Sequence, residues 1–570
     1  MPSGKNCSKD LAQTDLHRSR PLPVQLIDSG SHRMMKTTAV CLCLTAALVS
    51  GAEITGVWPQ PKSSDAGATT GLRIDATNFA FKYESAASPT LAAAFERYKA
   101  LMFPHAVAAA DLRLAPGGAA ALSEVLVTVA EVDESHPQLE TDESYSMQIG
   151  DDGSAKLDAA TIYGAMHGLE TLSQLVVFDF ETQAYTLGAG TPISIDDAPR
   201  FPHRGLMIDT ARHFETLAAI RSMVDSLPYA KVNVLHWHMV DSQSYPFQSK
   251  TYPKLWDGAY SDQERYTQAD IAAVVEYARL RGVRVMVEFD MPGHAGSWCK
   301  GNPEVCPSAS CREPLNVAAD ATWKLIESVL GECTGGKASA PGKPSGLFPD
   351  NFLHLGGDEV NTNCWTKTPS VKSWLDARNY TADQGYAYFV NRTAAIALSQ
   401  GRRPVQWVEV FDHFGSSLPK EVIVHVWKDK STLVPVVEAG YDALINNSPG
   451  SDSWYLDHLN IKWDACYGNE PCSAITDDKL CAKHVLGGQG EMWGETVDTS
   501  DFEQTVWPKM AAIAERLWSP RAVNNATAAQ PRLEQFRCLL NRRGIRSAPV
   551  NNANARSAPP GPGSCTVQRR

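Results

Sequence analysis

Apolar and polar positions alternate regularly along the second half of the chain, between residues 204 and 494. Short apolar runs of strand length are followed by polar loops, and most are separated by stretches such as 216–229 and 268–280. Those stretches carry apolar residues at the three-and-four spacing of an amphipathic helix. We expect eight strands, at residues 204–210, 232–241, 282–290, 352–359, 404–410, 421–428, 441–447 and 484–494. Eight strand–helix alternations predict an α/β fold of the (β/α)₈ barrel type, the TIM barrel.

The pattern is different before residue 198. Residues 53–197 hold short β-like runs, at 125–132 and 145–149, together with helical stretches at 91–102 and 160–176. No acidic or histidine cluster stands at a plausible reactive position there. We therefore expect a small α+β domain at 53–197 that carries no chemistry, a catalytic barrel at 198–546, and a tail rich in Pro, Arg and Ser at 547–570.

The first residues of the chain have the features of an export signal. Residues 1–33 show no hydrophobic periodicity, and we interpret them as an upstream extension without regular structure. Lys36 then precedes an apolar run at 38–49, followed by small residues at 50–52, which together predict a signal peptide at 34–52. The run is short for a bilayer span, so no stable membrane insertion is expected after cleavage. The alternative is an internal apolar segment of a cytosolic protein.

Cysteine usage agrees with export to an extracellular, lysosomal or vacuolar location. Three of the thirteen cysteines precede the expected cleavage site, and the remaining ten form no Cys-x-x-Cys pair. This spacing favours disulfides over a zinc ribbon, and Cys538 and Cys565 are placed to attach the tail to the body. Four Asn-x-Ser/Thr sequences would accept glycans in an exported chain, at Asn379, Asn391, Asn446 and Asn525.

Bulk charge bears on the class of partner. The formal net charge of -12 and the lack of a clustered basic face argue against nucleic acid. No phosphate-binding loop or dinucleotide fingerprint is present in a suitable context, so we expect no cofactor.

Two adjacent carboxylates, Asp358 and Glu359, follow the fourth expected strand and the pair Gly356-Gly357. Neighbouring side chains on a strand point to opposite faces, so both carboxylates can enter one pocket only if the glycines allow a turn. Two carboxylates in one apolar pocket tend to titrate apart, which suits glycoside cleavage. The structural alternative is an acidic turn between a strand and a loop.

Charged and aromatic side chains also follow the other strands, at the ends where barrel enzymes carry their active sites. Carboxylates, one arginine and several tryptophans in this arrangement fit a pyranose, whose hydroxyls bind charged groups and whose apolar faces stack on indoles. Core filling is the alternative for any single tryptophan. The residues concerned are Asp209, Arg212, Asp241, Asp290, His294, Trp407, Glu409, His425, Trp427, Trp454, Tyr455, Asp457, Trp493 and Glu495.

Six of these stretches, in this order, resemble the family 20 glycoside hydrolases, the β-N-acetylhexosaminidases. They are Ile-Asp-Thr-Ala-Arg-His-Phe around Arg212, His-Trp-His-Met-Val-Asp, Met-Pro-Gly-His, His-Leu-Gly-Gly-Asp-Glu, Trp-Tyr-Leu-Asp and Met-Trp-Gly-Glu. The resemblance covers roughly residues 53–540. It implies a carbohydrate substrate with a terminal β-linked N-acetylhexosamine, and cleavage with retention in which the substrate's own acetamide attacks the anomeric carbon.

The resemblance also implies roles for individual residues. Glu359 would be the general acid and then the base, and Asp358, staying ionised, would hold the acetamido nitrogen, while Tyr455 would donate to the acetamido oxygen. Asp290 and His294 would form a carboxylate–histidine pair behind the acid. The sugar would be bound by Arg212, Asp241, Trp407, Trp427, Asp457, Trp493 and Glu495.

Three further expectations follow from the same comparison. Asp457 near the 6-hydroxyl would disfavour a 6-sulfate, and the need for a protonated Glu359 predicts an acidic optimum. Cys364 would pair with one of the cysteines between 299 and 333. The segment 466–481 has no counterpart in the family pattern, so quaternary structure stays open, with a homodimer as one alternative.

Two other functions compete with this interpretation. A metal-dependent hydrolase could use His236 and His238, two apart on one strand, but no third histidine recurs in a matching context, and we expect no metal. A carbohydrate-binding protein without catalysis would not need an acid beside an acetamido-orienting carboxylate.

Overall fold

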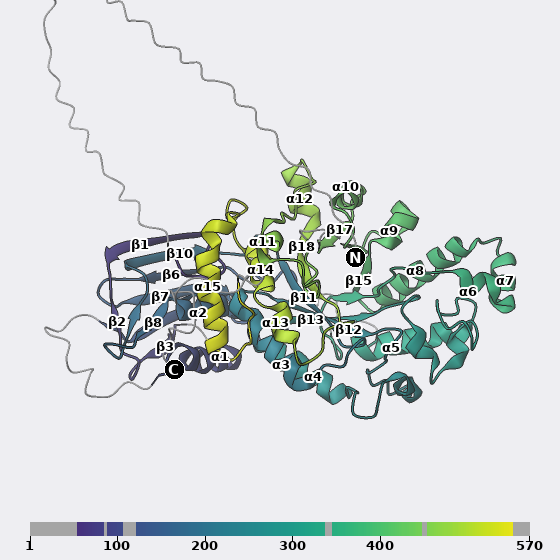
Figure 1. Ribbon diagram of the computed structural model, residues 1–570, viewed down its shortest axis with the longest axis horizontal. Coiled ribbons are helices and arrows are strands. Elements are labelled where there is room, and N and C mark those ends of the chain that lie inside the picture. Colours follow the sequence, from purple (N-terminus) through teal and green to yellow (C-terminus); the bar gives the residue numbers. More distant parts are fainter. Residues whose placement is uncertain (1–53, 85–87, 106–120, 337–344, 447–452, 551–570) are drawn as a thin grey trace, which may run out of the picture. The chain divides into compact units, whose positions relative to one another are not determined.

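Eight parallel strands close a barrel in chain order in the computed structural model, which describes residues 54–84, 88–105, 121–336, 345–446 and 453–550 (Figure 1). The predicted barrel is confirmed. Its strands are β11 (His203–Asp209), β12 (Val234–Val240), β13 (Arg284–Phe289), β14 (Phe352–His354), β15 (Arg403–Trp407), β16 (Ile423–Val426), β17 (Asp442–Ile445) and β18 (Val485–Met492).

Strand β14 is much shorter than predicted, because the chain turns before its two carboxylates. Gly356 and Gly357 have φ values of 66° and 97°, which are unfavourable for residues with a Cβ. A Cβ on Gly356 would also lie 1.7 Å from Oδ1 of Asp290. Residues 355–359, which we included in the range of the fourth strand, form the turn that we expected the two glycines to allow, and this turn admits both carboxylates to the barrel mouth.

Helices follow the strands, as expected. The stretch predicted at 216–229 forms α3 (Leu217–Ser226), capped by the hydroxyl of Thr216, and then the 3₁₀ helix η2 (Leu227–Ala230). The stretch at 268–280 forms α4 (Gln268–Arg279), which begins with a capping box between Thr267 and Asp270. The principal later helices are α5 (Asp320–Thr334), α8 (Ala382–Ser399), α10 (Leu433–Glu438), α12 (Asp478–His484) and α14 (Lys509–Trp518).

The barrel interior is filled in two layers. The lower layer, near the starts of the strands, is an apolar cluster of Val234, Met286, Phe352, Val405, Ile423 and Leu444. Two residues further along the strands the inward side chains are polar or aromatic, and all of them are buried. This upper layer comprises His236, Glu288, His354, Trp407 and His425.

The N-terminal region is an α+β unit, as expected. A six-stranded sheet has the order β1-β10-β6-β7-β5-β3, and its core is completed by α1 (Pro89–Met102) and α2 (Ile162–Leu175) (Figure 1). The strands are β1 (Ser63–Thr69), β3 (Ala80–Tyr83), β5 (Glu124–Glu131), β6 (Tyr145–Ile149), β7 (Ala155–Thr161) and β10 (Thr191–Asp197). A smaller sheet, β4-β2-β9-β8, is formed by β2 (Arg73–Ile74), β4 (Ala121–Leu122), β8 (Val176–Asp179) and β9 (Ala184–Leu187).

Buried ion pairs connect this unit to the base of the barrel, which the hydrophobic pattern did not reveal. Glu143 binds Arg204 on β11 at 2.8 Å and His167 on α2 at 2.9 Å. Lys231 binds Asp197 at 2.7 Å with both side chains fully buried. Burial raises the pKa of a lone carboxyl, yet the Arg204 and His167 contacts outweigh it and lower the pKa of Glu143 to about 2.

Three disulfides are present in the described part of the chain: Cys299–Cys306, Cys311–Cys364 and Cys472–Cys481. Cys364 pairs with Cys311, which is one of the cysteines between 299 and 333 among which we expected its partner. Cys333 remains a buried free thiol, so disulfides do not account for every cysteine after the expected cleavage site. Cys538 is also disulfide-bonded, while Cys565, the partner expected for it, lies outside the described residues, as do 1–53.

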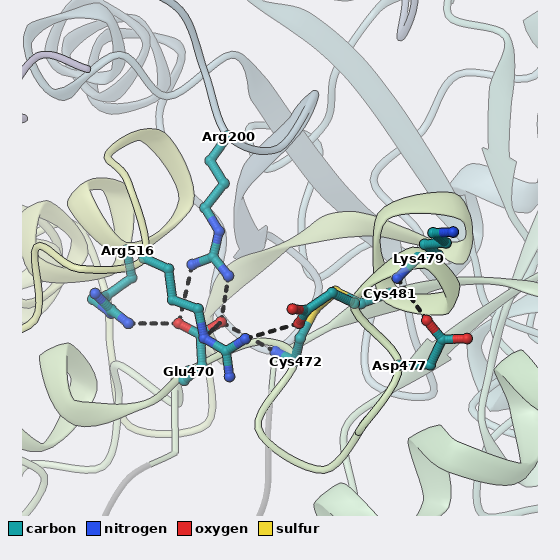
Figure 2. Close-up of a disulfide and its surroundings, with 9 residues drawn as sticks. Arg200, Glu470, Cys472, Asp477, Lys479, Cys481 and Arg516 are labelled. Carbon is teal, nitrogen blue, oxygen red and sulfur yellow. Dashed lines mark hydrogen bonds and ion pairs between the residues drawn. A yellow bond between two sulfur atoms is a disulfide. The ribbon is translucent and has the colours of Figure 1, made fainter. Parts of the chain in front are cut away.

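The Cys472–Cys481 bridge is attached to the barrel by an ion-pair cluster. Figure 2 shows the guanidinium groups of Arg200 and Arg516 turned toward the carboxylate of Glu470, two residues before Cys472. Arg200 Nη1 donates to Glu470 at 3.0 Å, and Arg516 Nη2 donates at 2.5 Å. The segment that had no counterpart in the family pattern is therefore held against α14.

One expected glycan acceptor is unsuitable. Asn446 is fully buried, and its amide donates to Glu491 at 2.9 Å, so a glycan cannot be attached without disrupting the barrel. Asn379 and Asn525 are exposed. No helix among the described residues has both the length and the apolar character needed to cross a bilayer.

Candidate active site

A cavity of about 490 Å³ opens where the barrel strands end. Ten of the twelve predicted site residues line it, and Asp241 and Asp290 lie behind the wall, both buried. Its size is in the range of small-ligand sites. The lining residues are Arg212, His294, Asp358, Glu359, Trp407, Trp427, Tyr455, Asp457, His458, Trp493, Glu495 and Thr496.

The turn after β14 brings Asp358 and Glu359 into this cavity. The N–H of Gly357 donates to Asp290 at 2.9 Å, and the hydroxyl of Tyr386 donates to the Gly357 carbonyl. Glu359 has a φ of 48°, a left-handed conformation that is strained for a residue with a side chain. Local backbone strain is characteristic of functional sites, and here it fixes the direction of the second carboxylate.

His294 joins the two carboxylates to a third. Its Nε2 lies 3.5 Å from Glu359 and 3.7 Å from Asp358, and its Nδ1 lies 3.3 Å from Asp241. We expected Asp290 to be the carboxylate paired with His294 behind the acid, but the carboxylate that faces His294 Nδ1 is Asp241. Burial opposes a charge on His294, yet these carboxylates outweigh it and raise its pKa well above 6.5. His294 is accordingly a cation.

The proton affinities of the two central carboxyls differ from our expectation. Burial raises the pKa of Asp358, whereas the hydrogen bond from His294 lowers the pKa of Glu359. We expected the reverse, an ionised Asp358 beside a protonated Glu359. The physical reason is exposure: the Glu359 side chain is 62% exposed and next to a cation, whereas that of Asp358 is 12% exposed.

Asp358 also has an unsatisfied oxygen. Its Oδ1 is buried and has no hydrogen-bond partner among the described residues, although the residue lines the cavity. A buried carboxylate oxygen without a donor is costly, so it is a binding point for an N–H or O–H group of a ligand.

Arg212 lies beside His294, with its Nη2 3.4 Å from the ring Nδ1, in an acidic environment. It binds Asp209 at 3.0 Å and Asp241 at 2.8 Å, and its guanidinium lies 5.0 Å from the centre of the Trp493 ring. Burial, together with the charge of Glu495, raises the pKa of Asp457 to about 6. Guanidinium and carboxylate groups so arranged can bind several vicinal hydroxyls.

Aromatic rings form the floor and one wall. The indole N–H of Trp407 donates to Glu288 at 2.9 Å, and that of Trp427 donates to Glu409 at 2.9 Å. Trp407 and Trp493 lie 6.0 Å apart. Trp454 does not line the cavity: it is fully buried, and its N–H donates to the Cys466 carbonyl at 3.0 Å. For this tryptophan the core alternative is correct.

Two cavity-lining residues, His458 and Thr496, were missed in the sequence, and Glu409 gains a clearer role in the structure. His458 stacks on Tyr455 at 5.2 Å with an interplanar angle of 17°, and Thr496 lines the wall. Burial and the charge of Asp358 raise the pKa of Glu409 to about 7. His458 and Thr496 directly follow two predicted site residues, and this adjacency is the only sequence signal for them.

The histidines of the rival metal hypothesis are engaged in hydrogen bonds. His238 Nδ1 and His236 Nε2 each lie 2.8 Å from the same oxygen of Glu288. Both ring nitrogens of His238 face carboxylates, those of Glu288 and Asp241, and His236 Nδ1 is hydrogen-bonded to the amide of Gln489 at 2.7 Å, so three of the four ring nitrogens already have hydrogen-bond partners.

Comparison with known proteins agrees with this geometry. Residues 201–521 match the family model described as "Glycosyl hydrolase family 20, catalytic domain", and residues 57–175 match "beta-acetyl hexosaminidase like". Beta-hexosaminidase 1 of Arabidopsis thaliana is 42% identical over 527 residues, which are 90% of this chain and 94% of the relative.

A mammalian relative and a solved structure extend the comparison. Beta-hexosaminidase subunit beta of Felis catus is 35% identical and covers 90% of this chain and 96% of its own length. The X-ray structure of Flavobacterium johnsoniae chitobiase matches with a TM-score of 0.73 and 27% identity, over 86% of this chain and 73% of that chain. The chain therefore belongs to glycosyl hydrolase family 20 and is a glycoside hydrolase of the β-hexosaminidase type.

Proposed function

We propose that the protein is an exo-acting β-N-acetylhexosaminidase that removes terminal, non-reducing β-linked GlcNAc or GalNAc with retention, using the substrate's acetamide as the nucleophile. The observation that carries this proposal is the buried Oδ1 of Asp358, which lacks a hydrogen-bond donor among the described residues. The N–H of a 2-acetamido group is such a donor. A sugar with a 2-hydroxyl would place a smaller group at this point.

In this mechanism Asp358 holds the acetamido nitrogen, and Tyr455 donates to the acetamido oxygen. The oxygen then attacks the anomeric carbon to give an oxazolinium ion, while Glu359 protonates the leaving oxygen and afterwards activates water. The substrate reverses the proton affinities found in the structure. An N–H donor lowers the pKa of Asp358, and the leaving group removes Glu359 from water and raises its pKa.

The rest of the cavity would recognise one sugar ring. Arg212 and Glu495 bind ring hydroxyls, and Asp457 binds the 6-hydroxyl. Trp407, Trp427 and Trp493 enclose the ring and the acetamido methyl. Asp241 and Asp290 act from behind this wall, through His294 and the Gly357 N–H.

The deciding experiment compares an aryl 2-acetamido-2-deoxy-β-glucoside with the aryl β-glucoside that lacks the acetamide, using wild type and Glu359→Gln. We expect turnover of the acetamido sugar only, with a large loss in the variant. Comparable turnover of the plain glucoside would favour a protein nucleophile. No turnover of either substrate by folded wild type would favour a carbohydrate-binding protein.

We also propose that the chain enters the secretory pathway and acts outside the cell or in a lysosome or vacuole. Three disulfides support an oxidising compartment, and residues 34–52 have the sequence of a signal peptide. N-terminal sequencing of protein secreted from a eukaryotic host tests this. An N-terminus near residue 53 is expected, and retention in the cytosol with an intact N-terminus would contradict it.

A further inference from the structure

The upper layer of the barrel interior holds a buried carboxylate, Glu288, that the proposed mechanism does not use. Its Oε2 lies 2.8 Å from both His238 Nδ1 and His236 Nε2, and its Oε1 lies 3.1 Å from His354 Nδ1. The same Oε1 accepts the indole N–H of Trp407 at 2.9 Å. All these side chains are fully or almost fully buried. Such a collection of ionisable groups is expensive to bury and needs an explanation.

His238 connects Glu288 to the acid side of the site. Its Nδ1 faces Glu288 at 2.8 Å, and its Nε2 faces Asp241 at 3.0 Å. A neutral imidazole has one N–H, so it can donate to only one of two ionised carboxylates. Because both ring nitrogens face carboxylates, the geometry itself favours the doubly protonated imidazolium. Its ring also packs edge-on against Trp493 at 5.1 Å.

The chain of contacts continues to Glu359. Asp241 binds Arg212 at 2.8 Å and His294 at 3.3 Å, and His294 in turn lies 3.5 Å from Glu359. The buried pair of Glu288 and His238 thus contacts Trp407, in the floor of the cavity. Through Asp241 it is also connected to Arg212 and, by way of His294, to Glu359.

We propose that Glu288 and His238 form a positioning pair, which keeps Asp241 ionised and oriented toward Arg212 and His294 and anchors Trp407 in the floor of the cavity. This inference rests on the proposed function of the cavity. Neither residue touches the cavity, so both would act through the groups they hold.

The surroundings of the pair favour these charges. Burial opposes ionisation of both groups, but the charge and the hydrogen bond of His238 keep the pKa of Glu288 well below its usual value, and Glu288 and Asp241 keep that of His238 well above 6.5. The titratable groups that face the pair are His236, Asp241, Asp209, His354 and His425, with Asp290 and Asp358 close by. Burial lowers the pKa of His354 to about 3, so it adds no positive charge near neutral pH.

The test is Glu288→Gln, which leaves an oxygen to accept from Trp407 and removes the charge. His238 can then lose its second proton. We expect kcat/KM for an aryl N-acetyl-β-glucosaminide to fall at least roughly 10-fold, and the loss to grow as the pH rises through the lowered pKa of His238. A phenyl leaving group, which needs protonation, should be affected more than 4-nitrophenyl.

Asp350→Asn is the matched control. Asp350 is a buried carboxylate of the same barrel, paired with Arg284 at 2.9 and 3.0 Å near the start of β14. The Asp350→Asn variant should have a lowered thermal stability, as Glu288→Gln should, yet its activity should keep the wild-type pH profile and leaving-group dependence. His238→Gln should lose activity without the added pH dependence, because the titrating group is gone.

A Glu288→Gln variant with wild-type kcat/KM, pH profile and leaving-group dependence would overturn the proposal. If that variant does not fold, wild type labelled with ¹⁵N-histidine provides a second measurement. The ring of His238, assigned by comparison with His238→Gln, should stay doubly protonated above pH 8, and titration near pH 6.5 would overturn the proposal. These outcomes are separate from failure of the proposed function, which would appear as wild-type turnover of the plain glucoside.

Discussion

The Cys311–Cys364 disulfide joins the loop after β13, which carries His294, to α6 (Asn363–Lys367), which follows the loop that carries Glu359. The two catalytic loops are therefore connected covalently as well as through the His294–Glu359 contact. Their separation of 53 residues makes the bridge a substantial constraint on the unfolded chain.

We expect Cys311→Ser/Cys364→Ser to lower the free energy of unfolding by about 4 kcal/mol, the chain-entropy value for a loop of this length. Urea unfolding of the double variant and wild type measures this change. Cys472→Ser/Cys481→Ser, which removes a bridge that spans only 9 residues and whose cysteines do not line the cavity, is the control. It should leave kcat/KM unchanged, whereas the first variant should lower it. Equal activity in both variants would contradict a role for the first bridge in holding the loops.

Tyr455→Phe tests the donor to the acetamido oxygen. Tyr455 keeps its proton at any ordinary pH because burial raises its pKa well above 10. Removing one preorganised donor from a developing charge costs on the order of 10²–10³ in kcat. We expect such a fall for aryl N-acetyl-β-glucosaminides, with little change in the thermal midpoint. A loss confined to KM would show that the hydroxyl binds the ground state and the transition state equally.

Asp457 should make discrimination against 6-sulfated sugars depend on pH. Its pKa is raised to about 6, so the carboxylate is charged above pH 6 and increasingly neutral below it. Repulsion of a 6-sulfate is thus strongest above pH 6 and weakens as the pH falls. We expect the ratio of kcat/KM for neutral over 6-sulfated aryl substrate to fall between pH 7 and pH 5. In Asp457→Asn the ratio should be low and flat, and a flat wild-type ratio would refute the role.

The barrel and most of the site were predictable for one physical reason. In a parallel barrel the strand ends meet at one edge, so residues that follow apolar runs converge wherever they lie in the sequence. From that rule we predicted that Arg212, Asp358 and Glu495 lie in one site, without knowing their contacts. Trp454 shows its limit, because a strand end does not tell whether an indole points into the cavity or into the core.

The protonation states of the site carboxyls and the hydrogen-bond partners of the buried side chains were not predictable, because they depend on burial and on atoms distant in sequence. Asp358 and Glu359 are neighbours in the chain, yet one is buried and the other lies beside a cationic histidine, which reverses the expected proton affinities. The same is true of Glu288, an ordinary charged residue in an apolar run whose importance comes from side chains on three other strands.

Glu409 should give the protein a pH-dependent loss of stability. Its pKa rises from 4.5 to about 7 on folding, because burial and Asp358 disfavour its charge. Between these values the folded state keeps a proton that the unfolded state has released, so this group lowers stability as the pH rises from 4.5 to 7, and not further above 7. A shift of this size corresponds to at most about 3 kcal/mol. Glu409→Gln keeps an acceptor for Trp427 and should remove the effect.

The measurement is urea unfolding of wild type and Glu409→Gln at pH 4.5 and pH 8. Glu215, whose pKa burial also raises to about 7, contributes to both proteins and cancels in the difference. We expect the free energy of unfolding of Glu409→Gln, relative to that of wild type, to increase from pH 4.5 to pH 8. Glu215 lies outside the cavity lining. Glu215→Gln should therefore show a change in relative stability of the same sign, without a change in Trp427 fluorescence. A difference that is independent of pH would show that Glu409 is ionised in the folded protein throughout, held by Trp427 and Lys428.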